Sequence, residues 1–319
     1  MEQRQSVQTE KNSCGILLLN KPAGLTSHDC VNKVRKLYST RQVGHTGTLD
    51  PMATGVLPIL IGRAVKASEY ISSESKRYSA VLQLGLTTDT EDITGTVLST
   101  SDEIPDTANV IDAALSFTGN ILQIPPMYSA LKRNGKKLVD LARAGQTIDR
   151  PARPVSIYSI ECTPIDACRF RLEVYCSKGV YIRTLCADIG AKLGCGGVMA
   201  SLHRRSSGNF SEKDCVTLEY LENADANLRK HLLLPLETAF SSLRKLYLPA
   251  FYRRIAGSGQ QIYLRKLKYE TGEEQLFSEG EYVRLYGADG FFALAQIRSF
   301  SSDDGSNELA AKPVKQFVI

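Results

Sequence analysis

The hydrophobic pattern of the chain begins with short apolar runs separated by polar, glycine-rich segments. The run Gly15-Ile-Leu-Leu-Leu-Asn20 is followed by Lys21-Pro-Ala-Gly24, which is typical of a buried strand that ends in a turn. Residues 41–55 are dense in Gly and Thr and show no period, so we predict a loop there. The segment Val56-Leu-Pro-Ile-Leu-Ile-Gly62 is apolar again and predicts a second strand.

Helical periodicity appears between these two strands and again later in the chain. Thr26 and Ser27 can cap a helix that extends to about Tyr38, with its apolar residues on one face. The other periodic segments predict strands at about 76–85, 155–163 and 169–176, and helices at about 108–117 and 180–194. Strands and helices are mixed without a strict βαβ rhythm, which favours an α+β fold over a doubly wound sheet.

The two ends of the chain differ from its middle. Residues 1–13 are polar and mixed in charge, which predicts a short disordered N-terminus. A boundary is expected near Leu232-Leu-Leu-Pro-Leu236, because Leu246–Ile319 is rich in Tyr and Gly and reads as a small β-rich domain. A chain of 319 residues has room for one large domain, here 14–245, and a smaller one at 246–319.

Composition narrows the classes of protein to which the chain can belong. It is 43% hydrophobic and 23% charged, and it lacks an apolar run near the roughly 18 residues that a membrane span needs. The N-terminus has no apolar stretch typical of a signal peptide, so we expect a cytoplasmic protein that does not enter a membrane. The eight cysteines are scattered, without a C-x-x-C pair. We therefore expect reduced thiols and neither a zinc site nor a disulfide framework.

Positive charge is concentrated in residues 125–155. This segment holds seven Lys and Arg side chains against Asp140 and Asp149, an excess equal to the formal net charge of +5 of the whole chain. The cations are Lys132, Arg133, Lys136, Lys137, Arg143, Arg150 and Arg153. Such a run is usually a solvated face, but it also suits a polyanionic partner. The pairs Arg204-Arg205 and Arg253-Arg254 offer further cations for phosphates.

The loop Gly44-His-Thr-Gly-Thr-Leu-Asp-Pro-Met-Ala-Thr-Gly-Val-Leu57 is the most informative stretch. Its glycines permit sharp turns, and Pro51 biases Asp50 toward an extended conformation. A carboxylate is thus expected on a rigid, non-helical loop beside threonine hydroxyls. A purely structural turn with an Asx hydrogen bond is the alternative, so the loop by itself only nominates Asp50.

This loop and the segment Leu19-Asn-Lys-Pro-Ala-Gly-Leu-Thr-Ser27 resemble the signature of the TruB family of tRNA pseudouridine-55 synthases. The resemblance covers about 14–245, and the tail from 246 resembles more loosely the PUA-type RNA-binding domain of that family. It continues at Lys76-Arg-Tyr-Ser79, Leu84-Gly-Leu-Thr-Thr-Asp-Thr-Glu-Asp-Ile-Thr-Gly95, Pro125-Pro-Met-Tyr-Ser-Ala-Leu-Lys132 and Cys176-Ser-Lys-Gly-Val-Tyr-Ile-Arg-Thr-Leu185. It implies a catalytic domain built on a mixed, mainly antiparallel sheet with flanking helices.

The resemblance implies a reaction that breaks the N1–C1′ bond of one T-loop uridine in tRNA, turns the base and rejoins it through C5. No cofactor and no metal are implied. Asp50 would act either as a base toward a glycal-like intermediate or as a nucleophile at C1′. An aspartate with an ordinary pKa of about 3.9 is ionised at neutral pH, as either role requires. Arg183 matches the arginine that pairs with this aspartate, and Tyr78 the tyrosine that stacks on the everted base and assists proton removal from C5.

Further matches concern the pocket and the RNA. Tyr181 and Leu202 correspond to pocket residues beneath the base, and Lys21 to a lysine that supports the active-site loop or a nearby phosphate. His45 corresponds to the residue that fills the space left by the everted uridine. The basic insertion, with Lys132, Arg133, Lys136 and Lys137, corresponds to a clamp over the T-stem-loop.

Two alternatives share these features. A guide-RNA-dependent relative would carry the same aspartate loop, but the short tail without a lysine-rich extension disfavours it. A catalytically silent RNA-binding module would be favoured by loss of Asp50, Tyr78 or Arg183, and all three are present. We therefore expect a stand-alone enzyme that needs no guide RNA, and the family resemblance implies a monomer.

Overall fold

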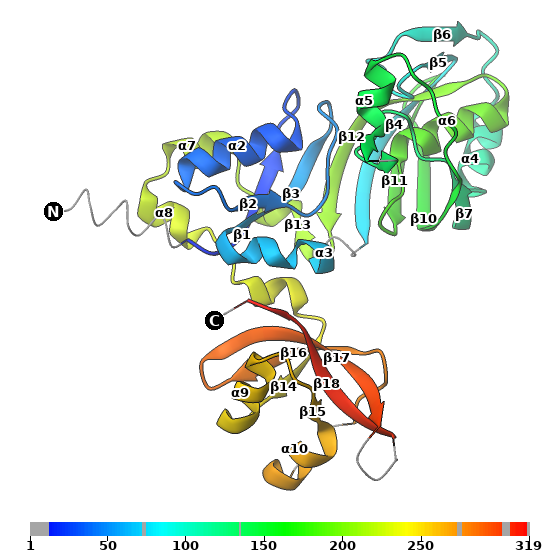
Figure 1. Ribbon diagram of the computed structural model, residues 1–319. Coiled ribbons are helices and arrows are strands. Elements are labelled where there is room, and N and C mark those ends of the chain that lie inside the picture. The colour runs from blue at the N-terminus through cyan, green and yellow to red at the C-terminus, as the bar shows by residue number, and fades with distance from the viewer. Residues whose placement is uncertain (1–12, 72–74, 134, 273–275, 302–306, 318–319) are drawn as a thin grey trace.

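The computed structural model describes residues 13–71, 75–133, 135–272, 276–301 and 307–317, and Figure 1 shows them as two sheet-based parts connected through a short helical segment. The disorder predicted for 1–13 falls almost wholly outside this range, although Ser13 is buried. No helix in these described ranges is long and apolar enough to cross a membrane.

The larger part is built on a nine-stranded sheet within the described residues. Its main path runs β1 (Gly15–Lys21), β3 (Thr54–Ile61), β12 (Gly197–Ser207), β4 (Lys76–Leu84), β11 (Arg169–Cys176), β10 (Arg153–Pro164) and β7 (Gly119–Gln123). The short strands β2 (Val43–His45) and β13 (Phe210–Ser211) pair with β3 and β12. Every pairing is antiparallel except that between β3 and β12, so the sheet is mixed and mainly antiparallel, as predicted.

The parallel contact between β3 and β12 sets the position of the loop that carries Asp50. It places Thr54 beside His203 and Gly55 beside Arg204. Gly55 has a φ of +101°, and a Cβ built on it would lie 2.3 Å from the Arg204 carbonyl oxygen. Only glycine therefore allows this approach, which brings the end of the 44–55 loop against the centre of the sheet.

Helices pack against the sheet of the larger part. The helices of this part are α2 (Ser27–Leu37), α3 (Ser68–Ile71), α4 (Thr107–Leu115), α5 (Leu138–Arg143), α6 (Ile182–Leu193), α7 (Leu218–Asn223) and α8 (Ala226–His231). Short 3₁₀ helices lie at η1 (Gly62–Ala67), η2 (Glu212–Asp214) and η3 (Leu236–Phe240). Thr26 caps α2 in a capping box with Asp29, and α6 ends at Gly194 in the left-handed conformation.

The sequence-based predictions of individual elements are largely confirmed. The expected strands correspond to β1, β3, β4, β10 and β11, and the expected helices to α2, α4 and α6. The prediction of a loop at 41–55 is wrong near both ends, because Val43–His45 pairs with β3 and β3 itself begins at Thr54. The central strand β12 was not predicted, since His203, Arg204 and Arg205 interrupt its apolar pattern.

The smaller part contains a five-stranded sheet with its own core among the described residues. The strand order is β14 (Arg244–Tyr247), β16 (Tyr282–Gly287), β17 (Gly290–Ser301), β18 (Asn307–Gln316) and β15 (Ile262–Tyr263), with helices α9 (Ala250–Gly257) and α10 (Leu264–Thr271) beside it. Two small sheets, β5 (Leu86–Thr88) with β6 (Val97–Thr100) and β8 (Lys132–Arg133) with β9 (Lys136–Lys137), project from the larger part.

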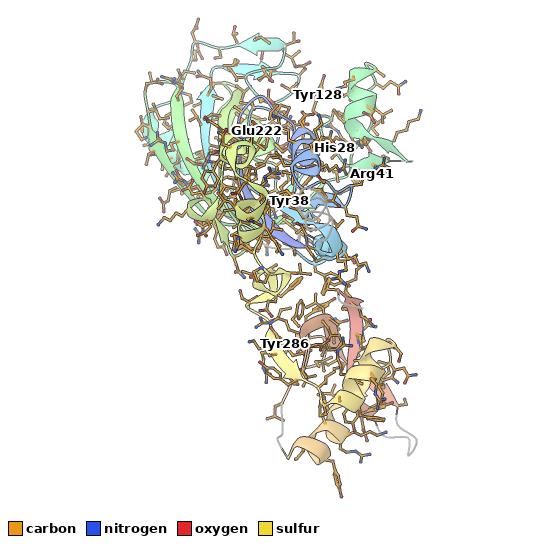
Figure 2. All side chains as sticks on the ribbon, turned by 90° about the vertical axis from the view of Figure 1, so that its left-hand side faces the viewer. His28, Tyr38, Arg41, Tyr128, Glu222 and Tyr286 are labelled. Atoms are coloured by element: carbon orange, nitrogen blue, oxygen red, sulfur yellow. The ribbon has the colours of Figure 1, made fainter. Side chains whose placement is uncertain are left out.

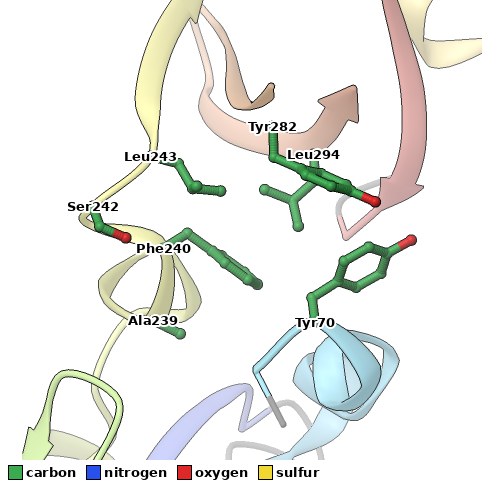
Figure 3. Close-up of a pocket in the computed structure, with 7 residues that line it drawn as sticks. All are labelled: Tyr70, Ala239, Phe240, Ser242, Leu243, Tyr282 and Leu294. Atoms are coloured by element: carbon green, nitrogen blue, oxygen red, sulfur yellow. The ribbon is translucent and has the colours of Figure 1, made fainter. Parts of the chain in front are cut away.

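A third apolar cluster joins the two parts. Ile16 and Leu60 from the large sheet pack with Phe240, Leu294 and Phe317. A cavity of about 210 Å³ lies at this junction (Figure 3). Its lining residues are Tyr70, Ala239, Phe240, Ser242, Leu243, Tyr282 and Leu294. The packing across the junction is therefore apolar but incomplete.

Candidate active site

The loop that carries Asp50 is fixed by buried polar side chains on both sides. Ser27, in the first turn of α2, accepts a hydrogen bond from the Leu49 amide at 2.8 Å and donates its hydroxyl to the Leu49 carbonyl at 3.1 Å. The Gly24 amide donates to the Pro51 carbonyl at 2.9 Å. Asp50 thus lies between two residues whose main chain is held in place.

Lys21 lies beneath the same loop and is fully buried. Its ammonium group donates to the carbonyls of Pro22, Pro51 and Ala53 at 2.8, 3.1 and 2.6 Å. Burial lowers the pKa of Lys21, while the negative charges around it, including that of Asp50, act in the opposite direction. A lysine has three donors, and all three are used on main-chain oxygens. The geometry therefore matches support of the loop and leaves no donor for a phosphate.

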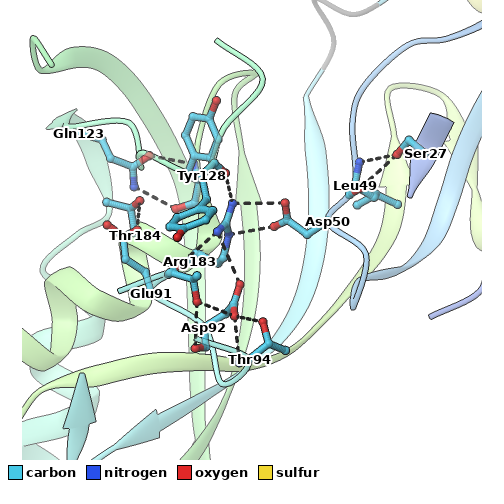
Figure 4. Close-up of polar contacts among 12 residues, drawn as sticks. Ser27, Leu49, Asp50, Glu91, Asp92, Thr94, Gln123, Tyr128, Arg183 and Thr184 are labelled. Atoms are coloured by element: carbon cyan, nitrogen blue, oxygen red, sulfur yellow. Dashed lines mark hydrogen bonds and ion pairs between the residues drawn. The ribbon is translucent and has the colours of Figure 1, made fainter. Parts of the chain in front are cut away.

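Arg183 faces Asp50 from the second residue of α6 and forms a two-pronged ion pair with it (Figure 4). Its Nε lies 2.9 Å from Asp50 Oδ2, and its Nη2 donates to Oδ1 at 3.2 Å. Such side-on pairing fixes the orientation of a carboxylate as well as its charge. The Arg183 side chain is 5% exposed and that of Asp50 is 30% exposed, so the carboxylate is the member of the pair that an entering molecule can reach.

Three further groups hold the Arg183 guanidinium. Nη1 donates to the Thr90 carbonyl at 3.0 Å, and Nη2 donates to the Tyr128 carbonyl at 2.7 Å. Nη1 also lies 3.5 Å from Asp92 Oδ2. Asp92 is buried and accepts hydrogen bonds from the Thr94 amide and hydroxyl at 3.0 and 2.6 Å. Arg183 is therefore clamped by the turn at 88–95 and by the start of the basic segment.

Asp92 and its neighbour Glu91 were not identified as site residues in the sequence. Both lie in the Leu84–Gly95 motif that resembles the family signature, which is the one signal that could have nominated them. Glu91 has a φ of 63°, uncommon for a residue other than glycine, and its carboxylate accepts a 2.6 Å hydrogen bond from the Thr184 hydroxyl on α6. The turn is thus attached to α6 beside Arg183.

The pKa of Asp50 departs from the ordinary value expected from the sequence. Burial raises it, and the Arg183 charge is the largest influence that lowers it. The nearby Asp92 charge raises it further, because two like charges disfavour each other. Asp50 is therefore a partly desolvated carboxylate that one arginine keeps oriented and favours in its charged form.

Tyr78 lies on strand β4, and Leu202 lies on the adjacent strand β12. The exposed fractions of their side chains are small, at 7% and 8%. Burial raises the pKa of Tyr78, and the Arg204 charge is the largest influence that lowers it. Tyr181, the residue before α6, is half-buried, and its main chain is fixed by Gln123, which accepts from its amide at 2.8 Å and donates to its carbonyl at 3.1 Å.

His45 ends strand β2, one residue before Thr46. Its Nδ1 and the Thr46 hydroxyl are buried without a hydrogen-bond partner among the described residues. Burial lowers the pKa of His45, with the Arg204 charge as the second cause, so the neutral ring is favoured at neutral pH.

Arg204 is not available for a phosphate. It is fully buried, and its Nε and Nη2 donate to the carbonyls of Val56 at 2.7 Å and Gly47 at 3.1 Å. The expectation of a phosphate contact at this residue is therefore wrong, because strand β12 turns its side chain into the core behind the loop that carries Asp50. Arg205 points the other way and pairs with Glu173 and Glu212.

The basic hairpin of β8 and β9 exposes all four of its predicted contact residues, which are Lys132, Arg133, Lys136 and Lys137. In Figure 2 this hairpin and α5 stand at the edge of the larger part, beyond the label of Tyr128. The Arg150 guanidinium donates to the Pro125 carbonyl at 3.0 Å. The Tyr128 carbonyl accepts a hydrogen bond from Arg183. The short stretch of main chain from Tyr128 to Lys132 therefore connects the Asp50–Arg183 ion pair to the hairpin.

Within the described ranges, no group of three or more His, Cys, Asp or Glu side chains is arranged to hold a metal ion. All eight cysteines are free thiols, with Cys14 the exposed one. The structure thus brings Asp50, Arg183, Tyr78 and Tyr181 close together, with Lys21 beneath the loop of Asp50. Leu202 belongs to the hydrophobic core on β12, where it pairs with Ala80.

Comparison with known proteins gives matches along nearly the whole chain. The model of the N-terminal domain of TruB family pseudouridylate synthases matches residues 35–182, and that of the tRNA pseudouridylate synthase B C-terminal domain matches 183–241. A tRNA pseudouridine synthase B of Clostridium kluyveri is 49% identical over 90% of this chain and 99% of its own length. One from Oceanobacillus iheyensis is 39% identical over 96% and 98%.

Solved structures show the same fold. A Cbf5-Nop10-Gar1 complex contains a chain that is 25% identical, with a TM-score of 0.70 over 99% of this chain and 87% of that one. A structure of an H/ACA RNP bound to a substrate RNA containing 2′-deoxyuridine gives 22% identity and a TM-score of 0.69, with the same two coverages.

Proposed function

The chain belongs to the TruB family of pseudouridylate synthases, and from this premise we propose that it converts one uridine in the T-loop of tRNA, at position 55, to pseudouridine. The two relatives described above, at 49% and 39% identity, are both named tRNA pseudouridine synthase B, and the match covers nearly their full length. The observation that carries the proposal is the Asp50–Arg183 pair at the centre of the site.

Asp50 is the reactive group of the proposed mechanism. Its carboxylate is the exposed member of the pair, while Arg183 fixes its orientation and favours its charged form. It acts on the ribose, either by taking a proton toward a glycal-like intermediate or by attacking C1′, and both routes break the N1–C1′ bond. The uracil then turns and is rejoined through C5.

The pocket around Asp50 suits a base removed from its stack. An enzyme that reworks a base has to take it out of the helix or loop, and side chains then hold it by stacking and apolar contact. In the proposal Tyr78 stacks on the everted uracil and exchanges protons with it, and Tyr181 and Leu202 pack beneath it. His45, whose ring is favoured in its neutral form, occupies the space that the uridine leaves in the T-loop.

The RNA is held by charge outside the pocket. Lys132, Arg133, Lys136 and Lys137 lie on an exposed hairpin and would meet T-stem phosphates. We assign 14–245 to the catalytic domain and 246–319 to a PUA-like RNA-binding domain, with the second sheet starting at Arg244. The enzyme acts without metal, cofactor or guide RNA, as a monomer in the cytoplasm.

The leading alternative is dependence on a guide RNA, since the solved structures of the same fold come from H/ACA ribonucleoproteins. The test is incubation of the purified protein with an unmodified tRNA transcript in EDTA, followed by pseudouridine mapping. We expect one pseudouridine, in the T-loop, and none in a transcript whose T-loop uridine is replaced by cytidine. Absence of product without an added RNA, or product at another position, would contradict the proposal.

A further inference from the structure

Arg204 is the largest side chain in the fully buried set of the described residues. Two of its donors are used on the main chain that flanks Asp50, at Gly47 before it and Val56 after it. The third, Nη1, is buried and has no hydrogen-bond partner there. A guanidinium has a fixed fork of donors, so Nη1 points where the other two determine.

The charge of Arg204 is not balanced by a carboxylate. Arg183 pairs with Asp50 and Asp92, and Arg205 pairs with Glu173 and Glu212, but Arg204 forms no ion pair with any acid of the described residues. Burial of an unpaired charge is strongly unfavourable, and such a group commonly serves a site. Packing alone therefore does not explain why a charged arginine is buried at position 204.

The phenol of Tyr78 lies opposite Arg204 in the strand pairing. Arg204 and Tyr78 are direct partners on the antiparallel strands β12 and β4, so both side chains leave the sheet on the same face. The phenol is buried, and Arg204 opposes the effect of that burial on its pKa more than any other group does. An unpaired cation with a free donor beside a buried phenol is suited to stabilise the phenolate.

We propose that Arg204 is a positioning residue that stabilises the phenolate of Tyr78 while the proton moves from C5 to N1 of the uracil. The inference rests on the proposed function and deepens the role of Tyr78 in it. Arg204 does not touch the substrate. Its effect on the reaction passes through Tyr78 alone.

The proton transfers of the reaction show when a Tyr78 phenolate would form. When the N1–C1′ bond breaks, its electron pair stays on the uracil, and ring electrons then form the C5–C1′ bond. At that point N1 lacks a proton and C5 carries one too many. The Tyr78 phenol gives its proton to N1, and the phenolate takes the proton from C5 while the electron pair of that C–H bond restores the double bond. Tyr78 ends unchanged.

The variant Arg204→Met tests the proposal in single-turnover reactions with saturating enzyme. The substrates are tRNA transcripts with hydrogen or deuterium at C5 of the target uridine. Acid–base groups typically contribute about 10²-fold or more to a rate, so we expect the chemical step to slow by about that factor. A primary isotope effect should appear, because proton removal from C5 becomes rate-limiting, while tRNA affinity stays unchanged.

Arg284→Met is the matched control. Arg284 is a buried arginine of the C-terminal sheet that donates to the carbonyls of Leu243 and Ser241 at 3.0 and 3.2 Å and lies beside Tyr286. Its loss removes similar contacts far from Asp50, so stability should fall while the chemical step and its isotope effect stay as in the parent. A slower chemical step in Arg204→Met without the isotope effect would mean a structural role and would overturn the proposal.

Tyr78→Phe separates this inference from the function on which it rests. If Arg204 acts through the phenol, the double variant Tyr78→Phe/Arg204→Met is no slower than Tyr78→Phe alone. Multiplied losses overturn the role of Arg204 and leave the proposed function intact. A Tyr78→Phe protein as fast as the parent instead removes the phenol from the mechanism, and the role of Arg204 with it.

Arg204→Lys carries the test if Arg204→Met does not fold. It retains a cation but loses the fork, so a smaller rate loss with the same isotope effect is expected. Fluorotyrosine at position 78, which has a more acidic phenol, should restore part of the rate in this background. No restoration would overturn the proposal.

Discussion

Arg183 contacts two carboxylates with one guanidinium, at 2.9 Å to Asp50 and 3.5 Å to Asp92. Asp92 has further partners in Thr90 and Thr94, whereas the hydrogen bonds to the Asp50 side chain come from Arg183. Burial and the Asp92 charge raise the pKa of Asp50, and Arg183 lowers it. The ionisation of Asp50 is therefore set by burial and the Asp92 charge, which disfavour it, and by the charges of Arg183 and Lys21, which favour it.

Asp92→Asn should shift the acid limb of the kcat/KM profile to lower pH. The reaction needs ionised Asp50, so activity is lost as pH falls through the Asp50 pKa, and removal of the Asp92 charge lowers that pKa. The measurement is the midpoint of the acid limb, whatever the plateau rate. Asp89→Asn, on the exposed side of the same turn, is the control. A shift to higher pH in Asp92→Asn would contradict the balance described here.

Asp188 on α6 should make the protein less stable as pH rises. Burial, and then the Glu91 charge, raise its pKa to about 6. The folded protein therefore favours the protonated form of Asp188 more than the unfolded chain does. The resulting contribution to stability is complete below the ordinary aspartate pKa of about 3.9 and is lost as pH rises through about 6. Asp188→Asn should therefore be more stable than the parent at neutral pH, by a margin that shrinks on acidification.

Urea unfolding of the two proteins at acidic and neutral pH measures this effect of Asp188→Asn. Asp112→Asn, on the exposed side of α4, controls for the change in net charge. A stability difference that grows as the solution is acidified would have the wrong sign and would rule out burial as the cause.

At this scale the sequence nominated Asp50 from the glycines and Pro51 around it, and the family resemblance added Arg183 and Tyr78. Asp92 and the buried state of Arg204 were missed. The contacts of Arg183 with Thr90 and Tyr128, and of Arg204 with Gly47, join residues far apart in the chain. The local pattern cannot contain such contacts, because the packing of distant segments against each other creates them.

Some of the elements around the site can be predicted from the sequence more accurately than others. Strands β1, β3 and β4 and helix α6 follow apolar periodicity and were predicted within a few residues. Strand β12 was missed because a core strand is not expected to contain a buried arginine. The parallel pairing of β12 with β3 was beyond prediction too, since it depends on the absence of a Cβ at Gly55.

The β8–β9 hairpin should account for part of the salt dependence of tRNA binding. Each phosphate that a cation neutralises contributes roughly 0.7 to 0.9 to the slope of log affinity against log salt. Alanine at Lys132, Arg133, Lys136 and Lys137 should therefore flatten that slope by about 3 if all four make contact, with little change in the single-turnover rate at saturation.

Lys→Arg exchange at positions 132, 136 and 137 is the matched control for these alanine variants, because it preserves the charge and should preserve the slope. The measurement is tRNA affinity over a salt series for the three proteins. An unchanged slope in the alanine variant would show that the hairpin is a solvated face, and that other cations hold the RNA.

At the scale of the whole molecule, the two sheets share an apolar junction and a cavity of about 210 Å³ (Figures 1 and 3). Phe240 lies at its centre, with ring centroids 6.1 Å from Phe291 and 6.0 Å from Phe317. The shared core couples the C-terminal sheet to β1 and β3, and thereby to the loop of Asp50.

Phe240→Ala should weaken this coupling. Truncation of a buried phenylalanine costs about 3–5 kcal/mol, and here the new space would add to an existing cavity. We expect calorimetry to show a lower first transition and a wider separation between the unfolding of the two sheets. Tyr269→Ala, at a side chain that is 96% exposed, should leave the trace unchanged. An unaltered trace for Phe240→Ala would mean that the junction does not couple the two parts.

The most direct test of the account is the single exchange Asp50→Asn, which keeps the shape of the side chain and removes its reactive oxygen. Pseudouridine formation on an unmodified tRNA transcript is measured at saturating enzyme, together with tRNA affinity, and Asp89→Asn serves as the control. We predict no product in single turnover for Asp50→Asn, with an affinity within about threefold of the parent, since little contact surface is lost. Product formation by Asp50→Asn at a rate comparable with the parent would show that Asp50 is not the catalytic group.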